Sequence, residues 1–243
     1  CAKAKAPLRA DLMEGLGLDT LKVGAVCVYP TMVGHAVKAL EGSNIPVASV
    51  ATGFPAGLMP LPLRLAAIRY AVEQGAGEID LVITREHVLK GEWSALYDEI
   101  KAMREACGPA HMKAILATGD LKTLTNVYRA SMVAMQAGSD FIKTSTGKED
   151  VNATLPVSLT MVRALRDYGE LSGQIAGFKP AGGLKTAKDA LAWLTLMKEE
   201  LGNRWLEPDL FRIGASSMLG DIERQLEHFV TGRYSSANRH AAA

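Results

Sequence analysis

The chain has 243 residues, 48% of them apolar, which is typical of one domain with a large buried core. Its 27 basic and 26 acidic residues give a net charge of +1 without a block of like charge, so nucleic acid and anionic membranes are excluded as expected partners. Three widely spaced cysteines exclude a disulfide framework and a zinc site, and no stretch approaches the ~18 apolar residues of a membrane helix, so we expect a cytoplasmic protein.

Short apolar, β-branched runs alternate with helical patterns along the chain. The runs predicted as strands are 25–29, 47–52, 79–84, 112–118, 141–144, 175–178 and 211–213. The main predicted helices are 61–74, 94–106, 121–136, 155–168, 187–201 and 219–230. Each of these helices ends just before a glycine that can adopt the left-handed conformation closing a helix: Gly75, Gly108, Gly138, Gly169, Gly202 and Gly232.

This alternation predicts an α/β fold with a parallel sheet and external helices, because parallel neighbours need crossover connections. An open nucleotide-binding sheet is less favoured. Its glycine-rich turn follows an early strand, whereas Gly75 and Gly77 precede a strand and lack the third glycine. We therefore predict a (β/α)8 barrel.

The predicted barrel lacks its first strand. Only seven strands are found, and residues 1–22 have the pattern of an amphipathic helix or loop. We hypothesise that a segment preceding Cys1 supplies the eighth strand, or that a partner fills the gap. The expected organisation is a single barrel domain over residues 1–234 and a flexible C-terminal tail over 235–243.

Two lysines occupy matching places in neighbouring apolar strands. Lys143 belongs to FIKTSTGK and Lys179 to GFKPAGG. Catalytic groups of β/α barrels lie at the C-terminal ends of the strands, so the two side chains can meet at one mouth. Desolvation and a second cation both lower a lysine pKa, which yields the neutral amine that attacks a carbonyl. The pair therefore predicts class I, Schiff-base aldolase chemistry, although a single lysine at a strand end is more often solvated or ion-paired.

Asp80 is a carboxylate inside the apolar strand EIDLV. Buried carboxylates are rarely left unpaired. One interpretation is a structural ion pair with a core lysine, and the other is a proton shuttle that works through water. Both place Asp80 beside a lysine.

Three late strands end in small residues: 145–148, 181–183 and 214–217. Such loops expose backbone N–H groups and hydroxyls, and phosphate sites of barrels form there. A phosphorylated substrate is therefore expected. STGK is not a P-loop, because Glu149 stands where Ser or Thr should follow the lysine, so a nucleoside triphosphate is not expected.

The histidines show no metal-binding spacing, which gives a metal-dependent aldolase little support. They are His35, His87, His111, His228 and His240, and surface positions are expected for them. Cys27, in AVCVYP, is expected to pack within its strand, although its place near the strand end leaves open a thiol at the mouth.

Taken together, these motifs resemble the deoxyribose-phosphate aldolase family. The matching segments, in family order, are AVCVYP, VASVATGFPAG, EIDLVI, ILATGDL, DFIKTSTGK, VNAT, GFKPAGG and FRIGASS. The resemblance covers nearly all of residues 1–234. It implies a TIM barrel that reversibly cleaves 2-deoxy-D-ribose 5-phosphate to D-glyceraldehyde 3-phosphate and acetaldehyde, with no metal or organic cofactor.

The resemblance also implies roles for individual residues. Lys143 corresponds to the Schiff-base lysine, Lys179 to its cationic, proton-transfer neighbour and Asp80 to the acid/base aspartate. Lys113 corresponds to a further lysine of the pocket. The positions that correspond to phosphate contacts are Gly147, Lys148, Gly182, Gly183, Gly214, Ser216 and Ser217. Cys27 is added to the expected substrate-binding residues only because its place near a strand end could bring its thiol to the mouth.

Two features depart from the family. Its first strand, with an acidic residue followed by threonines, has no counterpart here. The chain also lacks the terminal tyrosine that reaches back over the active site in some members, and Tyr234, followed by nine residues, is the only candidate for this role. Two alternatives therefore stay open: another class I aldolase cleaving a ketose or keto-acid phosphate, or a truncated, inactive barrel that binds phosphorylated ligands or has an assembly role. Formation of a homo-oligomer also stays open.

Overall fold

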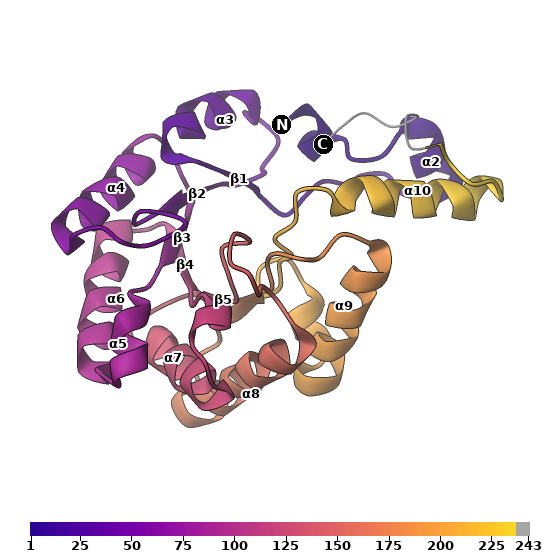
Figure 1. Ribbon diagram of the computed structural model, residues 1–243. Coiled ribbons are helices and arrows are strands. Elements are labelled where there is room, and N and C mark those ends of the chain that lie inside the picture. Colours follow the sequence, from indigo (N-terminus) through magenta and orange to yellow (C-terminus); the bar gives the residue numbers. More distant parts are fainter. Residues whose placement is uncertain (237–243) are drawn as a thin grey trace.

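The computed structural model describes residues 1–236 and contains one parallel sheet of six strands (Figure 1). The order in the sheet follows the chain, from β1 to β6, as a barrel requires. The strands are β1 (Val26–Val28), β2 (Val47–Ala51), β3 (Glu78–Val82), β4 (His111–Ile115), β5 (Phe141–Lys143) and β6 (Gly177–Lys179). The first six predicted strands are confirmed, within one to three residues at their ends.

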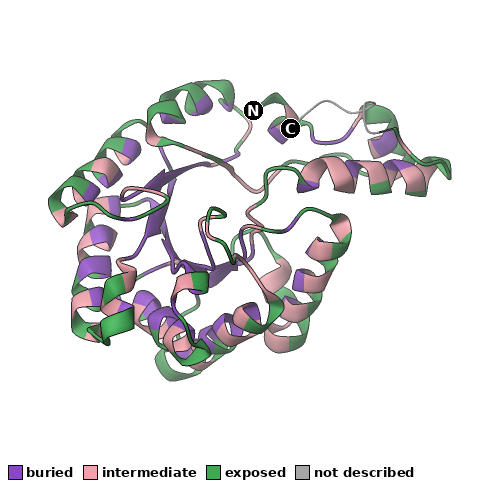
Figure 2. Ribbon diagram, viewed as in Figure 1, coloured by how far each residue is buried: buried purple, intermediate pink, exposed green. Residues whose placement is uncertain are grey.

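Most of the helices cover the outer face of the curved sheet (Figure 1). The helices are α1 (Ala2–Lys5), α2 (Ala10–Gly15), α3 (Val33–Ala39), α4 (Leu61–Glu73), α5 (Arg85–Lys90), α6 (Trp93–Cys107), α7 (Leu124–Gln136), α8 (Leu155–Ser172), α9 (Ala187–Leu201) and α10 (Met218–Thr231). Of these, α2 and α10 lie beside the barrel and pack on each other (Figure 1). Short 3-10 helices span Pro30–Met32, Thr118–Asp120 and Asn203–Leu206. Figure 2 shows the buried residues along the strands and on the inward sides of the helices.

Local sequence explains where several helices begin and end. Thr186 and Asp189 form a capping box at the start of α9, and the Thr123 hydroxyl caps α7. The prediction for α8 was wrong at its end. The helix continues through Gly169 and closes at Gly173, which has the left-handed φ of 71° that Gly169 lacks.

The barrel is continuous on one side only. All residues of β2 and β3 are buried, as expected for strands covered on both faces, whereas those of β1 are half-buried or exposed. The predicted strand at 211–213 was wrong. This segment makes only two isolated parallel bridges, from Phe211 to Phe178 and from Gly214 to Ala181. Among the described residues it has no strand neighbour on its other side, so no second ladder supports it.

The N-terminal residues pack against the C-terminal helix beside this open side, as α2 and α10 do in Figure 1. A side chain at Gly15 would meet Val230, and Arg9 lies 3.4 Å from the Glu227 carboxylate. The predicted helical character of residues 1–22 is confirmed, and none of these residues forms a strand. Within residues 1–236, none of the helices combines the length and apolar character needed to cross a membrane.

Candidate active site

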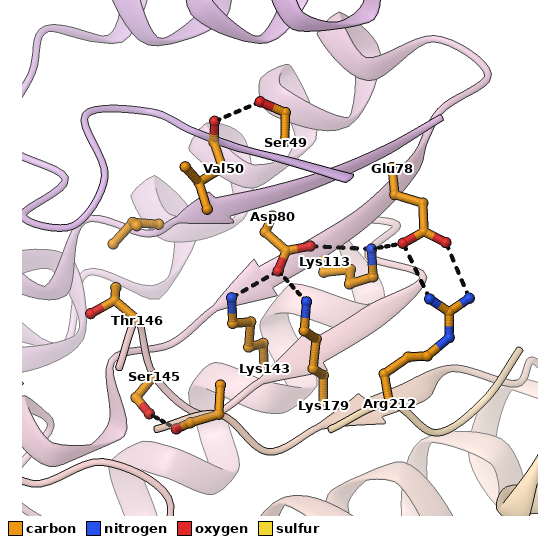
Figure 3. Close-up of polar contacts among 12 residues, drawn as sticks. Ser49, Val50, Glu78, Asp80, Lys113, Lys143, Ser145, Thr146, Lys179 and Arg212 are labelled. Atoms are coloured by element: carbon orange, nitrogen blue, oxygen red, sulfur yellow. Dashed lines mark hydrogen bonds and ion pairs between the residues drawn. The ribbon is translucent and has the colours of Figure 1, made fainter. Parts of the chain in front are cut away.

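Two lysine ammonium groups meet one carboxylate inside the barrel (Figure 3). Nζ of Lys143 lies 2.7 Å, and Nζ of Lys179 2.6 Å, from the same oxygen, Oδ2 of Asp80. The two lysines are level in the register of β5 and β6, so their side chains leave neighbouring strands at one height. All three residues are buried. The structure therefore brings together the lysine pair and the aspartate that the sequence singled out.

Lys113 extends this cluster toward the other end of the barrel interior (Figure 3). It is level with Asp80 in the register of β3 and β4, and its Nζ lies 3.1 Å from Oδ1 of Asp80. The same Nζ donates a hydrogen bond of 2.6 Å to Glu78. Arg212 approaches Glu78 from the segment after β6, at 3.1 Å. Two carboxylates are thus surrounded by four cationic side chains.

The surroundings shift the pKa values of the two lysines in opposite directions. Burial lowers the pKa of Lys143, and the charge of Lys179 lowers it further against the attraction of Asp80. Burial also disfavours the ammonium of Lys179, but the attraction of Asp80, together with those of Cys27 and Glu78, outweighs burial and raises the pKa. Lys143 is therefore the lysine with the better supply of neutral amine, and Lys179 is the one held as an ammonium.

The carboxylates are held in their charged forms. Burial raises the pKa of Asp80, but Lys113, Lys143 and Lys179 outweigh it and hold the pKa well below its usual value. For Glu78 the burial effect is likewise outweighed by its cationic neighbours, and its pKa is lowered. Oδ1 of Asp80 accepts no hydrogen bond from any described residue, and its contact is the ion pair with Lys113 at 3.1 Å.

The loops predicted to hold phosphate come together at the mouth. Gly147 and Gly182 have left-handed φ angles of 84° and 82°, and a Cβ on Gly147 would lie only 3.6 Å from the Cα of Gly182. Gly214 donates its N–H to the Pro180 carbonyl at 2.9 Å, which joins the third loop to the second. The remaining predicted positions lie in the same loops: Lys148, Gly183, Ser216 and Ser217.

These loops also contain N–H groups at a helix terminus. Ser217 is the N-cap of α10, and Ser216 and Ser217 are exposed just before the helix. A helix N-terminus next to glycine-rich loops favours an anion. The arrangement is suited to a phosphate group.

The expectation that Cys27 packs within its strand was wrong. Cys27 is exposed, although its register with Ala48, and through Ala48 with Glu78, places it on the interior face of the sheet. The reason is the open side of the barrel, because no described strand covers β1 there. Tyr234 stacks on His228, with ring centroids 4.4 Å apart, and not on the lysines.

His111 is level with Glu78 in the register of β3 and β4, and the other described histidines lie on α3, α5 and α10. His35 and His111 are exposed as predicted, whereas His87 and His228 are half-buried in contacts with Glu92 and Tyr234. His240 and the rest of 237–243 lie outside the described residues, and so does most of the predicted tail. In residues 1–236, His, Cys, Asp and Glu side chains form no group of three or more that could hold a metal ion.

Sequence reasoning missed two members of the cluster, Glu78 and Arg212. Glu78 could have been found, because it stands two residues before Asp80 in the same strand and therefore shares its face. Arg212 gave no such signal. Its segment forms only isolated bridges, so strand alternation does not predict where its side chain lies.

Comparison with known proteins gives consistent matches. The model of the DeoC/LacD family aldolases matches residues 3–217. Over 240 residues the chain is 64% identical to the deoxyribose-phosphate aldolase of Mus musculus and 63% identical to that of Homo sapiens. Each alignment covers 97% of this chain and 76% of the relative.

Solved structures agree in fold. An aldolase named QR15 superposes with a TM-score of 0.70 at 26% identity, covering 90% of this chain and 86% of that chain. The tetrameric deoxyribose phosphate aldolase from Aeropyrum pernix gives a TM-score of 0.66 at 23% identity, over 86% of this chain and 78% of that chain. The second likeness supports the fold alone.

Proposed function

Since the chain belongs to the DeoC/LacD family of aldolases, we propose that it reversibly cleaves 2-deoxy-D-ribose 5-phosphate to D-glyceraldehyde 3-phosphate and acetaldehyde. The observation that carries the proposal is the contact of two buried lysines with one oxygen of Asp80. One lysine has a lowered pKa and the other a raised one, which is the division of roles that Schiff-base catalysis requires.

In the proposed reaction, the neutral amine of Lys143 attacks the aldehyde carbon of the open-chain sugar. Loss of water then gives a protonated imine. A base removes the proton of the hydroxyl on the third carbon, the bond between the second and third carbons breaks, and its electron pair moves to the imine to form an enamine. Glyceraldehyde 3-phosphate leaves, the enamine is protonated on carbon, and water releases acetaldehyde and regenerates Lys143.

Asp80 and Lys179 are suited to the proton transfers. Asp80 contacts both lysines through Oδ2, and a water bound beside this carboxylate would relay protons between it and the substrate. The ammonium of Lys179 supplies a positive charge that disfavours protonation of Lys143 before attack. In this proposal the ion pair between Lys113 and Oδ1 keeps the Asp80 carboxylate in place.

We assign phosphate binding to the mouth loops. Gly147, Lys148, Gly182 and Gly183 would face the phosphate from the loops after β5 and β6, and Gly214, Ser216 and Ser217 from the start of α10. Cys27 would line the open side of the same interior. The proposal includes a cytoplasmic location and a homo-oligomer.

The test is cleavage of deoxyribose 5-phosphate coupled to detection of glyceraldehyde 3-phosphate. We expect turnover by the chain and a loss of ~10³-fold or more in Lys143→Leu, because the nucleophile is removed. Lys101→Leu is the matched control, since Lys101 is exposed on α6, and it should keep its activity. Acetaldehyde with borohydride should add an ethyl group at Lys143 and leave Lys143→Leu unlabelled at this site.

Other outcomes would favour the alternatives. Cleavage of ketone-derived sugar phosphates in preference to deoxyribose 5-phosphate would support another class I aldolase. Thermal stabilisation by phosphate without any turnover or labelling would support an inactive barrel, which the open side between β1 and residues 211–214 makes the second candidate.

A further inference from the structure

An uninterrupted series of ion pairs joins the lysine pair to Arg212 (Figure 3). Asp80 contacts Lys113 at 3.1 Å, Lys113 contacts Glu78 at 2.6 Å, and both guanidinium NH groups of Arg212 lie 3.1 and 3.4 Å from the two oxygens of Glu78. The pairing of Arg212 with Glu78 is the two-pronged contact that a guanidinium makes with a carboxylate. Every member except Arg212 is buried.

Arg212 is held in this position by its own surroundings. Its Nε donates to the carbonyl of Pro208, and a Cβ on Gly24 would lie only 3.0 Å from its Cδ and 3.1 Å from its Nε. Gly24 has no left-handed φ, so its lack of a side chain matters here for space and not for backbone conformation. The Arg212 side chain thus passes the segment before β1 and reaches Glu78 from the open side of the barrel.

Charged and titratable groups face Lys143 from four other strands: Cys27 of β1, Asp80 of β3, Lys113 of β4 and Lys179 of β6. Glu78 contacts Lys113, and Arg212 contacts Glu78. Lys113 is shared between the two carboxylates, so any change in the charge of Glu78 alters the hold of Lys113 on Asp80. Asp80 in turn contacts Lys143 directly.

We propose that Arg212 and Glu78 are positioning residues for the lysine pair: together they fix Lys113 against Oδ1 of Asp80 and set the net charge that Lys143 experiences. Neither residue contacts Lys143 itself in the described contacts. Their influence passes through Lys113 and Asp80. This inference rests on the proposed Schiff-base role of Lys143.

The proposal predicts opposite effects for the two residues. Removing the cation in Arg212→Met leaves excess negative charge near Lys143, which favours the ammonium and moves its titration to higher pH. Removing the anion in Glu78→Gln has the reverse effect and moves the titration to lower pH. A purely structural role would impair the site in both variants without opposite shifts.

The experiment measures the Lys143 amine directly, by competitive acetylation with trace acetic anhydride at a series of pH values and peptide mass spectrometry. We expect the midpoint to move up by roughly half a unit or more in Arg212→Met and down by a similar amount in Glu78→Gln, since charges within the barrel are weakly screened. Arg212→Lys should return the midpoint toward that of the unchanged chain. Far-UV circular dichroism establishes that each variant is folded.

Gly24→Ala gives a second route that leaves every charged group in place. Its added methyl group displaces Arg212, so the Lys143 midpoint should move up, by less than in Arg212→Met. Gly77→Ala is the matched control, because a Cβ there meets nothing within 4 Å, and it should leave the midpoint unchanged.

Shifts in the same direction for Arg212→Met and Glu78→Gln, or no shift in Gly24→Ala and Arg212→Met, would overturn the inference. Acetylation requires no aldolase activity. A chain that fails to cleave deoxyribose 5-phosphate would therefore refute the proposed function, while the acetylation midpoints would still decide whether Arg212 and Glu78 control Lys143.

Discussion

The two sides of the barrel differ in how their strands are supported. From β3 to β6 each strand is hydrogen-bonded to the next, and Asp80, Lys113, Lys143 and Lys179 all lie on these four strands. On the opposite side, β1 pairs only with β2 among the described strands, and the segment 211–214 makes two isolated bridges. Groups that must be held within fractions of an ångström are on the supported side, where neighbouring strands fix their backbone.

The largest loss of stability should appear when the carboxylate of Asp80, on the supported side, is neutralised. Asp80→Asn leaves the ammonium groups of three buried lysines without their common anion, and we expect a loss of about 3–5 kcal/mol in the free energy of unfolding. Urea denaturation measures this loss. Aldolase turnover should fall in parallel.

Asp209→Asn is the control for the Asp80 change. Asp209 pairs with Arg204 on the surface, so its ion pair is screened by solvent and its removal should leave the denaturation midpoint unchanged. Equal losses in the two variants would show that the buried cluster does not stabilise the fold more than a surface pair does.

A smaller loss of stability should follow when one methyl group is added to a glycine on the supported side or on the open side of the barrel. A Cβ on Gly177 of β6 would lie 2.5 Å from the Phe141 ring, which is enclosed by the barrel, so Gly177→Ala should cost about 1–3 kcal/mol. Gly24→Ala meets only the Arg212 side chain, which can move, and should cost less. Thermal unfolding of both variants checks the order, and the reverse order would contradict the distinction between the two sides.

The smallest effect on stability is expected at the cysteines, whose thiols should differ instead in their reactivity. Cys107 is buried on α6, and burial raises the pKa of its thiol to about 12, so iodoacetamide should not modify it in the folded protein. Burial of the sulfur and the charge of Asp80 raise the pKa of Cys27 as well, but Cys27 is exposed on the open side and should be alkylated before Cys107. Cys27→Ser should change the free energy of unfolding by less than ~0.5 kcal/mol.

The alkylation experiment has an internal reference. Urea should make Cys107 as reactive as Cys27, because unfolding removes the burial that raises its pKa. Protection of Cys27 in the folded chain equal to that of Cys107 would mean that the interior beside β1 is closed to solvent.

The sequence predicted those parts of the molecule that depend on short, repeated patterns. Apolar runs located the six strands, and the position of Lys143 and Lys179 at matching places in adjacent strands predicted that they would meet. Asp80 was identified because a carboxylate in an apolar strand needs a partner. These inferences needed only strand periodicity and the convergence of strand ends.

Other features depend on which segments are neighbours in space. The exposure of Cys27 follows from the uncovered side of β1, and the contact of Arg212 with Glu78 joins residues 134 positions apart. Neither leaves a local pattern. The end of α8 was misjudged because Gly169 and Gly173 are equally suited to close a helix by residue type, and only the packed structure selects Gly173.

The excess of cations in the barrel interior has a consequence for the rate of substrate encounter. Arg212, Lys113, Lys143 and Lys179 face two carboxylates, so the interior is positive even when Lys143 is neutral, although the whole chain carries a net charge of only +1. A positive region attracts a diffusing phosphate ester, and dissolved salt weakens this attraction. Capture of the sugar phosphate should therefore slow as ionic strength rises, while the bond-breaking steps at the buried lysines, where salt screens charges much less, keep their speed.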